Sequence, residues 1–269
     1  MPEQERNDFT LAYQDSCSGP TILLIHGFPL NSSLWESQIE DLSDTARVLA
    51  PDLRGFGLSE ATPAPYSMEM MADDCMGLLD SLGIQEPVVV CGLSMGGYIA
   101  FEFYRRFPDW VAGLILVATR AGADDEVGRA GRDNMIAGVR ESGVEPVSRA
   151  MLPKLLAPTT YERNELLVNF VREMVESSTP EGLVGALEAM KTRPDSTPLL
   201  ADINVPVLII HGEEDQIIPV SQAEAMRDEI PNAKLVILPG AGHLPNLEQA
   251  DAFNEAVWDF LQSLEEEGE

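Results

Sequence analysis

Short runs of apolar, β-branched residues alternate with amphipathic segments over most of this chain. The apolar runs include residues 21–25, 88–90, 114–117 and 205–210. Between them, segments such as residues 68–82 place apolar side chains at three- and four-residue steps, which predicts helices. Strands that are apolar on both faces and separated by helices predict a mainly parallel sheet that helices cover on both sides. We therefore expect an α/β fold.

The strand pattern stops between residues 120 and 196. Amphipathic helical patterns replace it, for example around Leu167, Phe170 and Val171. Thr179 followed by Pro180 is a favourable helix start, because threonine caps the free amides and proline fits the first turn. We expect residues 120–196 to form a helical cap, inserted into a core made of residues 1–119 and 197–269.

Residues 88–97, with the sequence VVVCGLSMGG, predict a strand and a sharp turn with Ser94 at its apex, and a helix is expected to follow over residues 98–107. Gly92 and Gly96 would allow the strand and the helix to approach closely, and the turn would hold the Ser94 hydroxyl over the end of the sheet. A glycine-rich turn without chemistry would have the same pattern. Because a serine hydroxyl is a weak nucleophile, a catalytic role requires a histidine base, an acid that orients it and backbone donors for an oxyanion.

The chain has three histidines. His26 and His211 each follow a predicted strand directly and precede a glycine, which favours a structural role at a strand end. His243 instead lies in a loop between the last predicted strand and the last helix. Loops at the carboxyl ends of parallel strands meet at one edge of the sheet, where ligands bind. We therefore predict that His243 is the base for Ser94.

The acid should also follow a strand, and Asp215 does so after the run at residues 205–210. The apolar residues 217–219 beyond it could bury the carboxylate. Glu213 and Glu214 compete for this role, as does the pair at residues 124–125 after another strand, in which Asp124 is the main alternative to Asp215.

The order Ser94, Asp215, His243 is the order of the catalytic triad in α/β-hydrolases. Five segments match that family in sequence order: HGF at 26–28, DLRGFGLS at 52–59, GLSMGG at 92–97, GEED at 212–215 and GAGH at 240–243. The chain thus resembles α/β-hydrolases over residues 10–264, in particular small carboxylesterases and enol-lactonases. The resemblance implies the α/β-hydrolase fold with an inserted cap, and a serine esterase that acts through an acyl-enzyme intermediate.

The same resemblance implies an oxyanion hole formed by the backbone amides of Phe28 and Met95. Phe28 has the N–H group that the following Pro29 lacks. In the matching loop, we expect Asp52 and Arg54 to form an ion pair.

Other activities use the same triad and remain open. They are lactone or enol-lactone hydrolysis, carbon–carbon bond hydrolysis, and cofactor-free perhydrolase or haloperoxidase activity. A signalling protein that binds an effector without turnover is the non-enzymatic alternative. Arg120, beside the cap, could meet a carboxylate on a substrate, although pairing with Asp124 or Asp125 is favoured.

Seventeen basic and 45 acidic residues give a net charge of −28, which repels nucleic acids and anionic membranes. We therefore expect neither as a partner. We expect the substrates to be small neutral esters or lactones, and the protein to be a monomer or homodimer. The three cysteines form no CxxC pair, so we expect reduced thiols. The first ten residues lack a signal-peptide pattern and no apolar run could span a membrane, so we expect a cytoplasmic protein. Without a dinucleotide fingerprint, a phosphate-loop lysine or a metal-ligand cluster, we expect no cofactor and no metal.

Overall fold

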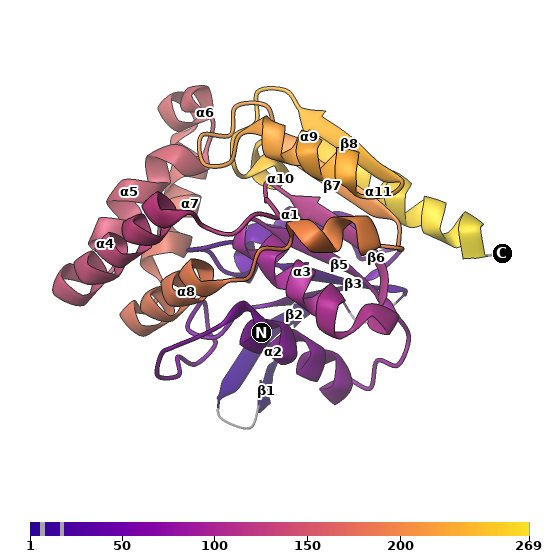
Figure 1. Cartoon of the computed structure of the whole chain (residues 1–269), viewed down its shortest axis with the longest axis horizontal. Helices are drawn as coiled ribbons and strands as arrows, with labels where there is room; N and C mark the ends of the chain where they lie inside the picture. Colours follow the sequence, from indigo (N-terminus) through magenta and orange to yellow (C-terminus); the bar gives the residue numbers. More distant parts are fainter. Residues whose placement is uncertain (6–8, 17–18, 269) are drawn as a thin grey trace.

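A computed structural model describes residues 1–5, 9–16 and 19–268 of the chain, so that Cys17 lies outside the described residues. Its centre is a sheet with the strand order β1-β2-β4-β3-β5-β6-β7-β8 (Figure 1). The strands are β1 (Glu3–Glu5), β2 (Thr10–Asp15), β3 (Thr21–Ile25), β4 (Arg47–Pro51), β5 (Val88–Leu93), β6 (Val111–Val117), β7 (Val207–Gly212) and β8 (Ala233–Leu238). The pairs β1–β2 and β2–β4 are antiparallel, and the pairs from β4 through β8 are parallel. The predicted α/β fold with a mainly parallel sheet is confirmed.

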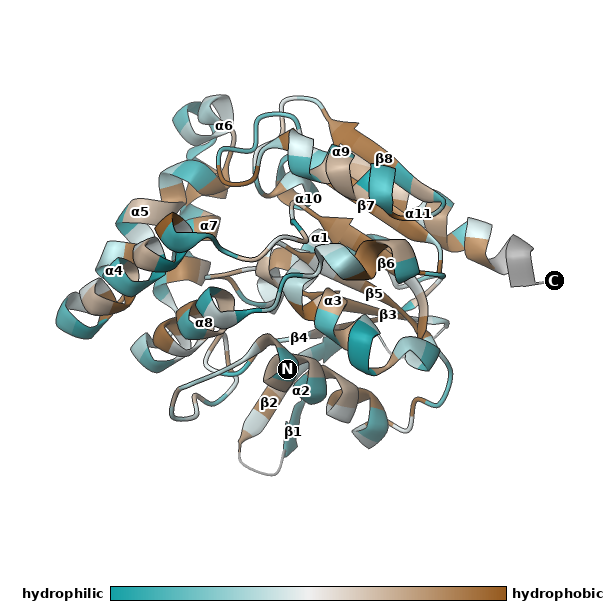
Figure 2. Ribbon diagram, in the orientation of Figure 1, coloured by the Kyte–Doolittle hydropathy of each residue, from teal (hydrophilic) through white to brown (hydrophobic). Residues whose placement is uncertain are grey.

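Alternate residues of each central strand point to opposite faces of the sheet and join two separate cores. In β5, for example, Val88 and Val90 pack with α2 (Met68–Ser81), α3 (Met95–Arg106) and α9 (Val220–Glu229). Val89 and Cys91 pack on the other face with α1 (Glu36–Leu42) and α11 (Ala250–Gly268). Figure 2 shows these strands as the most hydrophobic part of the ribbon. Burial on both faces explains why the strands read as continuous apolar runs in the sequence.

Between β6 and β7 the described chain contains helices and no strand. These helices, called the helical insertion below, are α4 (Glu126–Ser142), α5 (Glu145–Leu155), α6 (Pro158–Arg163), α7 (Glu165–Glu176) and α8 (Pro180–Thr192). Figure 1 shows them grouped at one end of the molecule, where α4 packs on α8 and α5 on α7. Short 3-10 helices (Ser32–Trp35, Pro108–Trp110 and Thr197–Asp202) and α10 (Pro245–Glu248) complete the fold.

Two helices begin where the sequence predicts. The Ser67 side chain accepts a hydrogen bond from Met70 N at the start of α2, and Thr179 accepts one from Gly182 N at the start of α8. Each cap satisfies one amide that would otherwise lack an acceptor. None of the helices in the described ranges is long and apolar enough to cross a membrane.

Candidate active site

Ser94 connects β5 to α3 with a strained backbone. Its φ of 55° and ψ of −109° lie outside the regions that non-glycine residues favour. Two hydrogen bonds hold this turn against the end of β6: Ser94 N donates to Val117 O at 2.8 Å, and Thr119 Oγ1 donates to Ser94 O at 2.8 Å. This is the geometry of a nucleophile elbow, in which the serine hydroxyl stands at the edge of the sheet.

Glycine is required on both sides of this elbow. A Cβ atom on Gly92 would lie 2.2 Å from Gly96 O, and a Cβ atom on Gly96 would lie 2.1 Å from Ile25 O. These separations are far shorter than any real contact of a Cβ atom with backbone. The predicted close approach of strand and helix is confirmed, and it extends to the neighbouring strand β3.

His243 and Asp215 form a buried pair, with 2.7 Å between His243 Nδ1 and Asp215 Oδ2. The other carboxylate oxygen of Asp215 accepts hydrogen bonds from Ile217 N at 2.8 Å and Ile218 N at 3.0 Å. Burial by itself would raise the pKa of Asp215. The charge of His243 and hydrogen bonds from His211, His243 and Ile218 outweigh it and hold this pKa well below its ordinary value.

An ionised Asp215 can only accept hydrogen bonds, so Nδ1 of His243 carries a proton, and Nε2 is the ring nitrogen that can take a proton when the imidazole is neutral. Within the described part of the chain, Nε2 is buried and makes no hydrogen bond. No hydrogen bond is therefore formed between Ser94 and His243 Nε2 in this structure. Both side chains belong to loops at the carboxyl ends of strands, β5 for Ser94 and β8 for His243.

The other histidines serve the strand ends, as predicted. His26 Nε2 accepts a hydrogen bond from Leu53 N at 2.9 Å, and its Nδ1 lies 3.0 Å from Gly27 O; burial lowers its pKa. His211 Nε2 lies 2.8 Å from Ile218 O and 3.3 Å from Asp215 Oδ2. This second contact to Asp215 was not predicted, although both residues lie in the segment HGEED.

Three of the four competing acids are engaged elsewhere. Asp124 forms ion pairs with three arginines, one of which is Arg120, as favoured from the sequence. Asp125 caps α4 by accepting from Gly128 N. Glu213 Oε2 lies 3.4 Å from Gly240 N. Among the candidate acids, Asp215 is thus the one that contacts His243.

The expected ion pair between Asp52 and Arg54 is wrong. Arg54 pairs with Asp74 of α2, at 2.6 Å between Nε and Oδ2. The carboxylate of Asp52 instead accepts backbone hydrogen bonds from Ser32 N and Leu58 N, each at 2.8 Å. Asp52 therefore orders the loop through main-chain amides.

Phe28 and Met95, the predicted oxyanion donors, are both buried. Phe28 follows Gly27, whose position for a Cβ atom lies 3.2 Å from the Cβ of Ser94, so that the loop after β3 abuts the elbow. Among the described residues, the amides of Phe28 and Met95 have no acceptor in the protein. Two free N–H groups beside the serine are what an oxyanion hole requires.

Two further side chains, which the sequence analysis did not identify, connect the loops of His243 and Asp215 to the helical insertion. Glu248 accepts hydrogen bonds from Gly242 N at 2.7 Å and from Ala157 N at 2.9 Å. Gln216 Nε2 donates to Leu156 O at 3.1 Å. Because these contacts join segments far apart in the sequence, no local pattern signals them. Burial raises the pKa of Glu248, and the nearby charge of Glu214 adds to that effect.

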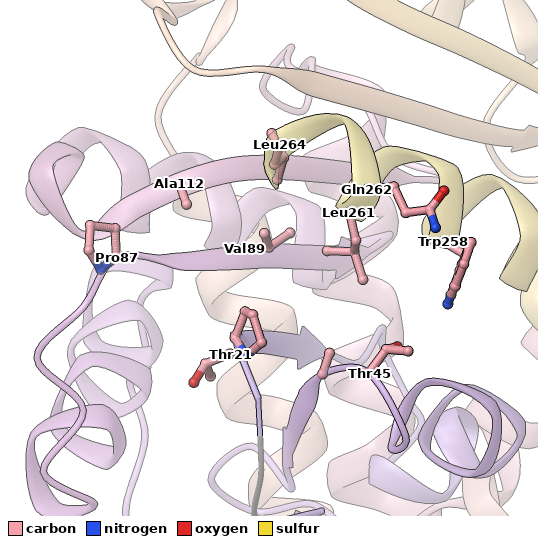
Figure 3. A pocket seen from close by; sticks show the side chains of 11 residues that line it. Thr21, Thr45, Pro87, Val89, Ala112, Trp258, Leu261, Gln262 and Leu264 are labelled. Atoms are coloured by element: carbon pink, nitrogen blue, oxygen red, sulfur yellow. The ribbon is translucent and has the colours of Figure 1, made fainter. Parts of the chain in front are cut away.

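A cavity of about 420 Å³ lies near the amino ends of the parallel strands, whereas Ser94 and His243 follow their carboxyl ends (Figure 3). Its lining includes Thr21, Pro87 and Ala112, near the amino ends of β3, β5 and β6, and Trp258 and Leu261 of α11. The predicted site residues do not line it. The predicted catalytic residues and this cavity therefore lie at opposite ends of the parallel strands.

Comparison with known proteins places the chain among hydrolases. A sequence model of the alpha/beta hydrolase fold matches residues 20–250. A thermophilic esterase from Thermogutta terrifontis, solved with malate bound, has a TM-score of 0.93 and 41% identity over 95% of this chain and 94% of that one. The enol-lactonase from Burkholderia xenovorans LB400 has a TM-score of 0.90 and 31% identity over 97% of this chain and 100% of its own. The 3-oxoadipate enol-lactonase 2 of Acinetobacter baylyi is 29% identical over 88% of this chain and 87% of its own length.

Proposed function

Because this chain belongs to the α/β-hydrolase fold family, whose members similar to it include esterases, enol-lactonases and other hydrolases, we propose that it is a serine esterase. Its substrates would be small carboxylic esters, cleaved through an acyl-enzyme intermediate. The observation that carries this proposal is the buried pair of Asp215 and His243, whose free Nε2 lies at the same edge of the sheet as the strained Ser94.

In the first half-reaction, the Ser94 oxygen attacks the ester carbonyl carbon while His243 Nε2 takes the hydroxyl proton. Asp215 accepts the Nδ1–H bond and stabilises the positive imidazolium that forms. The carbonyl oxygen becomes an oxyanion, which the amides of Phe28 and Met95 bind. Collapse of this intermediate breaks the bond to the alcohol, which leaves with the proton from His243.

In the second half-reaction, His243 takes a proton from water, which attacks the acyl carbon. The second tetrahedral intermediate collapses to release the carboxylic acid, and the proton returns to Ser94. Loss of a single oxyanion donor typically reduces kcat by about two to three powers of ten. The backbone amides of Phe28 and Met95 are therefore expected to contribute a large part of the rate enhancement.

The decisive experiment is hydrolysis of p-nitrophenyl acetate and butyrate by the wild type and by Ser94→Ala. We expect loss of turnover in the variant with an unchanged thermal midpoint, because Ala removes only the hydroxyl. A fluorophosphonate probe should label the wild type at Ser94 and leave the variant unlabelled. A variant that keeps most of the wild-type turnover would overturn the proposal.

Lactone hydrolysis is the second candidate, since two of the similar proteins are named enol-lactonases. The same attack by Ser94 opens a ring instead of releasing a separate alcohol. Rates on an ester and on a lactone with the same acyl length, both abolished by Ser94→Ala, would rank the two activities.

A further inference from the structure

Four arginines converge on one buried aspartate where the helical insertion leaves and rejoins the sheet. The side chain of Asp124 is 1% exposed. Its carboxylate contacts Arg120 Nη2 at 2.6 Å, Arg193 Nη1 at 2.8 Å and Arg132 Nε at 3.0 Å. Arg129 Nη1 donates to the backbone oxygen of Asp124 at 2.7 Å. One carboxylate balances one guanidinium, so this group, called the arginine cluster below, has an excess of positive charge.

One other acidic side chain near the cluster, Asp195, reduces this excess without removing it. Asp195 has a lowered pKa because of hydrogen bonds from Thr197 and the charge of Arg193, so it balances that arginine in part. Arg120 and Arg132 form no ion pair besides the one with Asp124 in the described ranges. The chain as a whole has a net charge of −28, so a local excess of arginine side chains contrasts with the rest of the protein. This contrast favours a specific role for the cluster.

Two of these arginines have donors to spare and reach solvent. The side chains of Arg120 and Arg132 are 33% and 22% exposed. Arg120 Nε is buried, and within the described chain it lacks a hydrogen-bond partner, as does Arg193 Nε. A buried donor without an acceptor is unfavourable, and a guanidinium pairs best with a planar anion that has two oxygen atoms. The cluster is therefore suited to a carboxylate.

The cluster borders the nucleophile elbow on two sides. Arg120 directly follows Thr119, whose hydroxyl donates to Ser94 O at 2.8 Å. Tyr98 lies one turn after Ser94 in α3, which is roughly 6 Å along the helix. The guanidinium of Arg193 stacks on the ring of Tyr98, 4.1 Å from its centre. The cluster therefore adjoins the elbow through Thr119 and Tyr98.

Resting on the proposed esterase function, we propose that Arg120 and Arg132 form a carboxylate-binding subsite, and that the preferred substrates are small esters or lactones that bear a free carboxylate. This preference is opposite to the expectation from net charge. The local excess of guanidinium groups acts within a few ångströms, whereas salt screens the distant acidic residues over about 10 Å.

The test compares two esters of equal chain length, mono-p-nitrophenyl succinate and p-nitrophenyl butyrate. We expect the wild type to have the higher kcat/KM for the anionic ester. Arg120→Gln and Arg132→Gln should each lower the ratio of the two kcat/KM values about tenfold, the usual order for a charge-assisted hydrogen bond. Arg140→Gln is the matched control, because Arg140 is an exposed arginine of α4 outside the cluster. It should leave the ratio unchanged.

Two measurements keep the test decisive if a variant fails to fold. The wild-type ratio should fall when salt is raised from 10 to 500 mM, which needs no variant. Calorimetry of Ser94→Ala should show succinate binding that an added Arg120→Gln weakens about tenfold. The subsite is refuted if the wild type does not favour the anionic ester and Ser94→Ala does not bind succinate. It is also refuted if Arg140→Gln lowers the ratio of the two kcat/KM values as much as the cluster variants do. Absence of all ester turnover would refute the esterase proposal, while the succinate result would still decide the subsite.

Discussion

Gly96→Ala is the substitution for which the structure predicts the largest effect from a single methyl group. The new Cβ atom would lie 2.1 Å from Ile25 O, 2.8 Å from Ile25 C and 3.0 Å from His26 O. Ordinary contact begins at 3.4 Å, so the nearest separation is about 1.3 Å too short. All three atoms belong to the backbone, which cannot rotate away as a side chain could. The start of α3 or the end of β3 must therefore move by about 1 Å.

This displacement affects both stability and rate. Overpacking in a close-packed core lowers the free energy of unfolding by about 1–3 kcal/mol, and the higher helix propensity of alanine offsets at most about 1 kcal/mol of this loss. A thermal midpoint lower by several degrees follows for a domain of this size. The displaced residues lead directly to Phe28, whose amide is a proposed oxyanion donor. Because a misplacement of 1 Å can cost about 100-fold in rate, kcat should fall about 10- to 100-fold.

Ester hydrolysis at 25 °C and a thermal melt of the same preparation measure both effects. Gly131→Ala is the control, since Gly131 lies in α4 and a Cβ atom there would meet no atom within 4 Å. This variant should keep its activity and melt at the same or a slightly higher temperature. A Gly96→Ala protein with wild-type kcat and midpoint would refute the argument from backbone contact.

Four further results are expected. Asp215→Asn should lower kcat by about three to four powers of ten without unfolding the protein, because the amide cannot hold the imidazole as the carboxylate does; wild-type kcat would contradict this. Since folding lowers the pKa of Asp215, its stabilisation is complete above the ordinary value of about 3.9 and is lost as the pH falls below it. Urea unfolding at pH 2.5–5 should therefore show a weaker pH dependence for Asp215→Asn, and equal slopes would refute the assignment. Glu248→Ala should lower kcat about tenfold with little change in KM, because Gly242 N beside His243 loses its acceptor; a change in melting temperature alone would refute a positioning role. Burial raises the pKa of the Cys91 thiol, so in a Cys17→Ser background a thiol reagent should modify it only after denaturant is added.

Much of the fold could be predicted because its determinants are local. The central strands are apolar on both faces, and Ser67 and Thr179 mark helix starts in the sequence itself. One boundary was missed: the helix after the elbow was expected from residue 98, but α3 begins at Met95. Gly96 and Gly97 disfavour a helix in isolation, and packing against β3 and β6 overrides that preference.

The site could be predicted only as far as it depends on the ends of strands. Asp215 was predicted as the acid because the parallel sheet should bring its loop beside that of His243, and the two side chains do lie in contact, at 2.7 Å. The partner of Arg54 was not predicted, because Asp74 lies on a helix 20 residues away, whereas Asp52 is a near neighbour in sequence. Contacts that depend on how elements pack leave no local pattern.

In the proposed function, the helical insertion supports the acid–base pair and the substrate preference through different contacts. Gln216, next to the acid, and Glu248, which holds the loop of the base, bind main-chain atoms of Leu156 and Ala157. Main-chain acceptors and donors persist when side chains change, so these contacts can hold Asp215 and His243 in place whatever residues the insertion carries. The arginine cluster, by contrast, consists of side chains in the two connections of the insertion and in its first helix, α4. Substitutions there can change which substrates bind while the geometry of the acid–base pair is preserved.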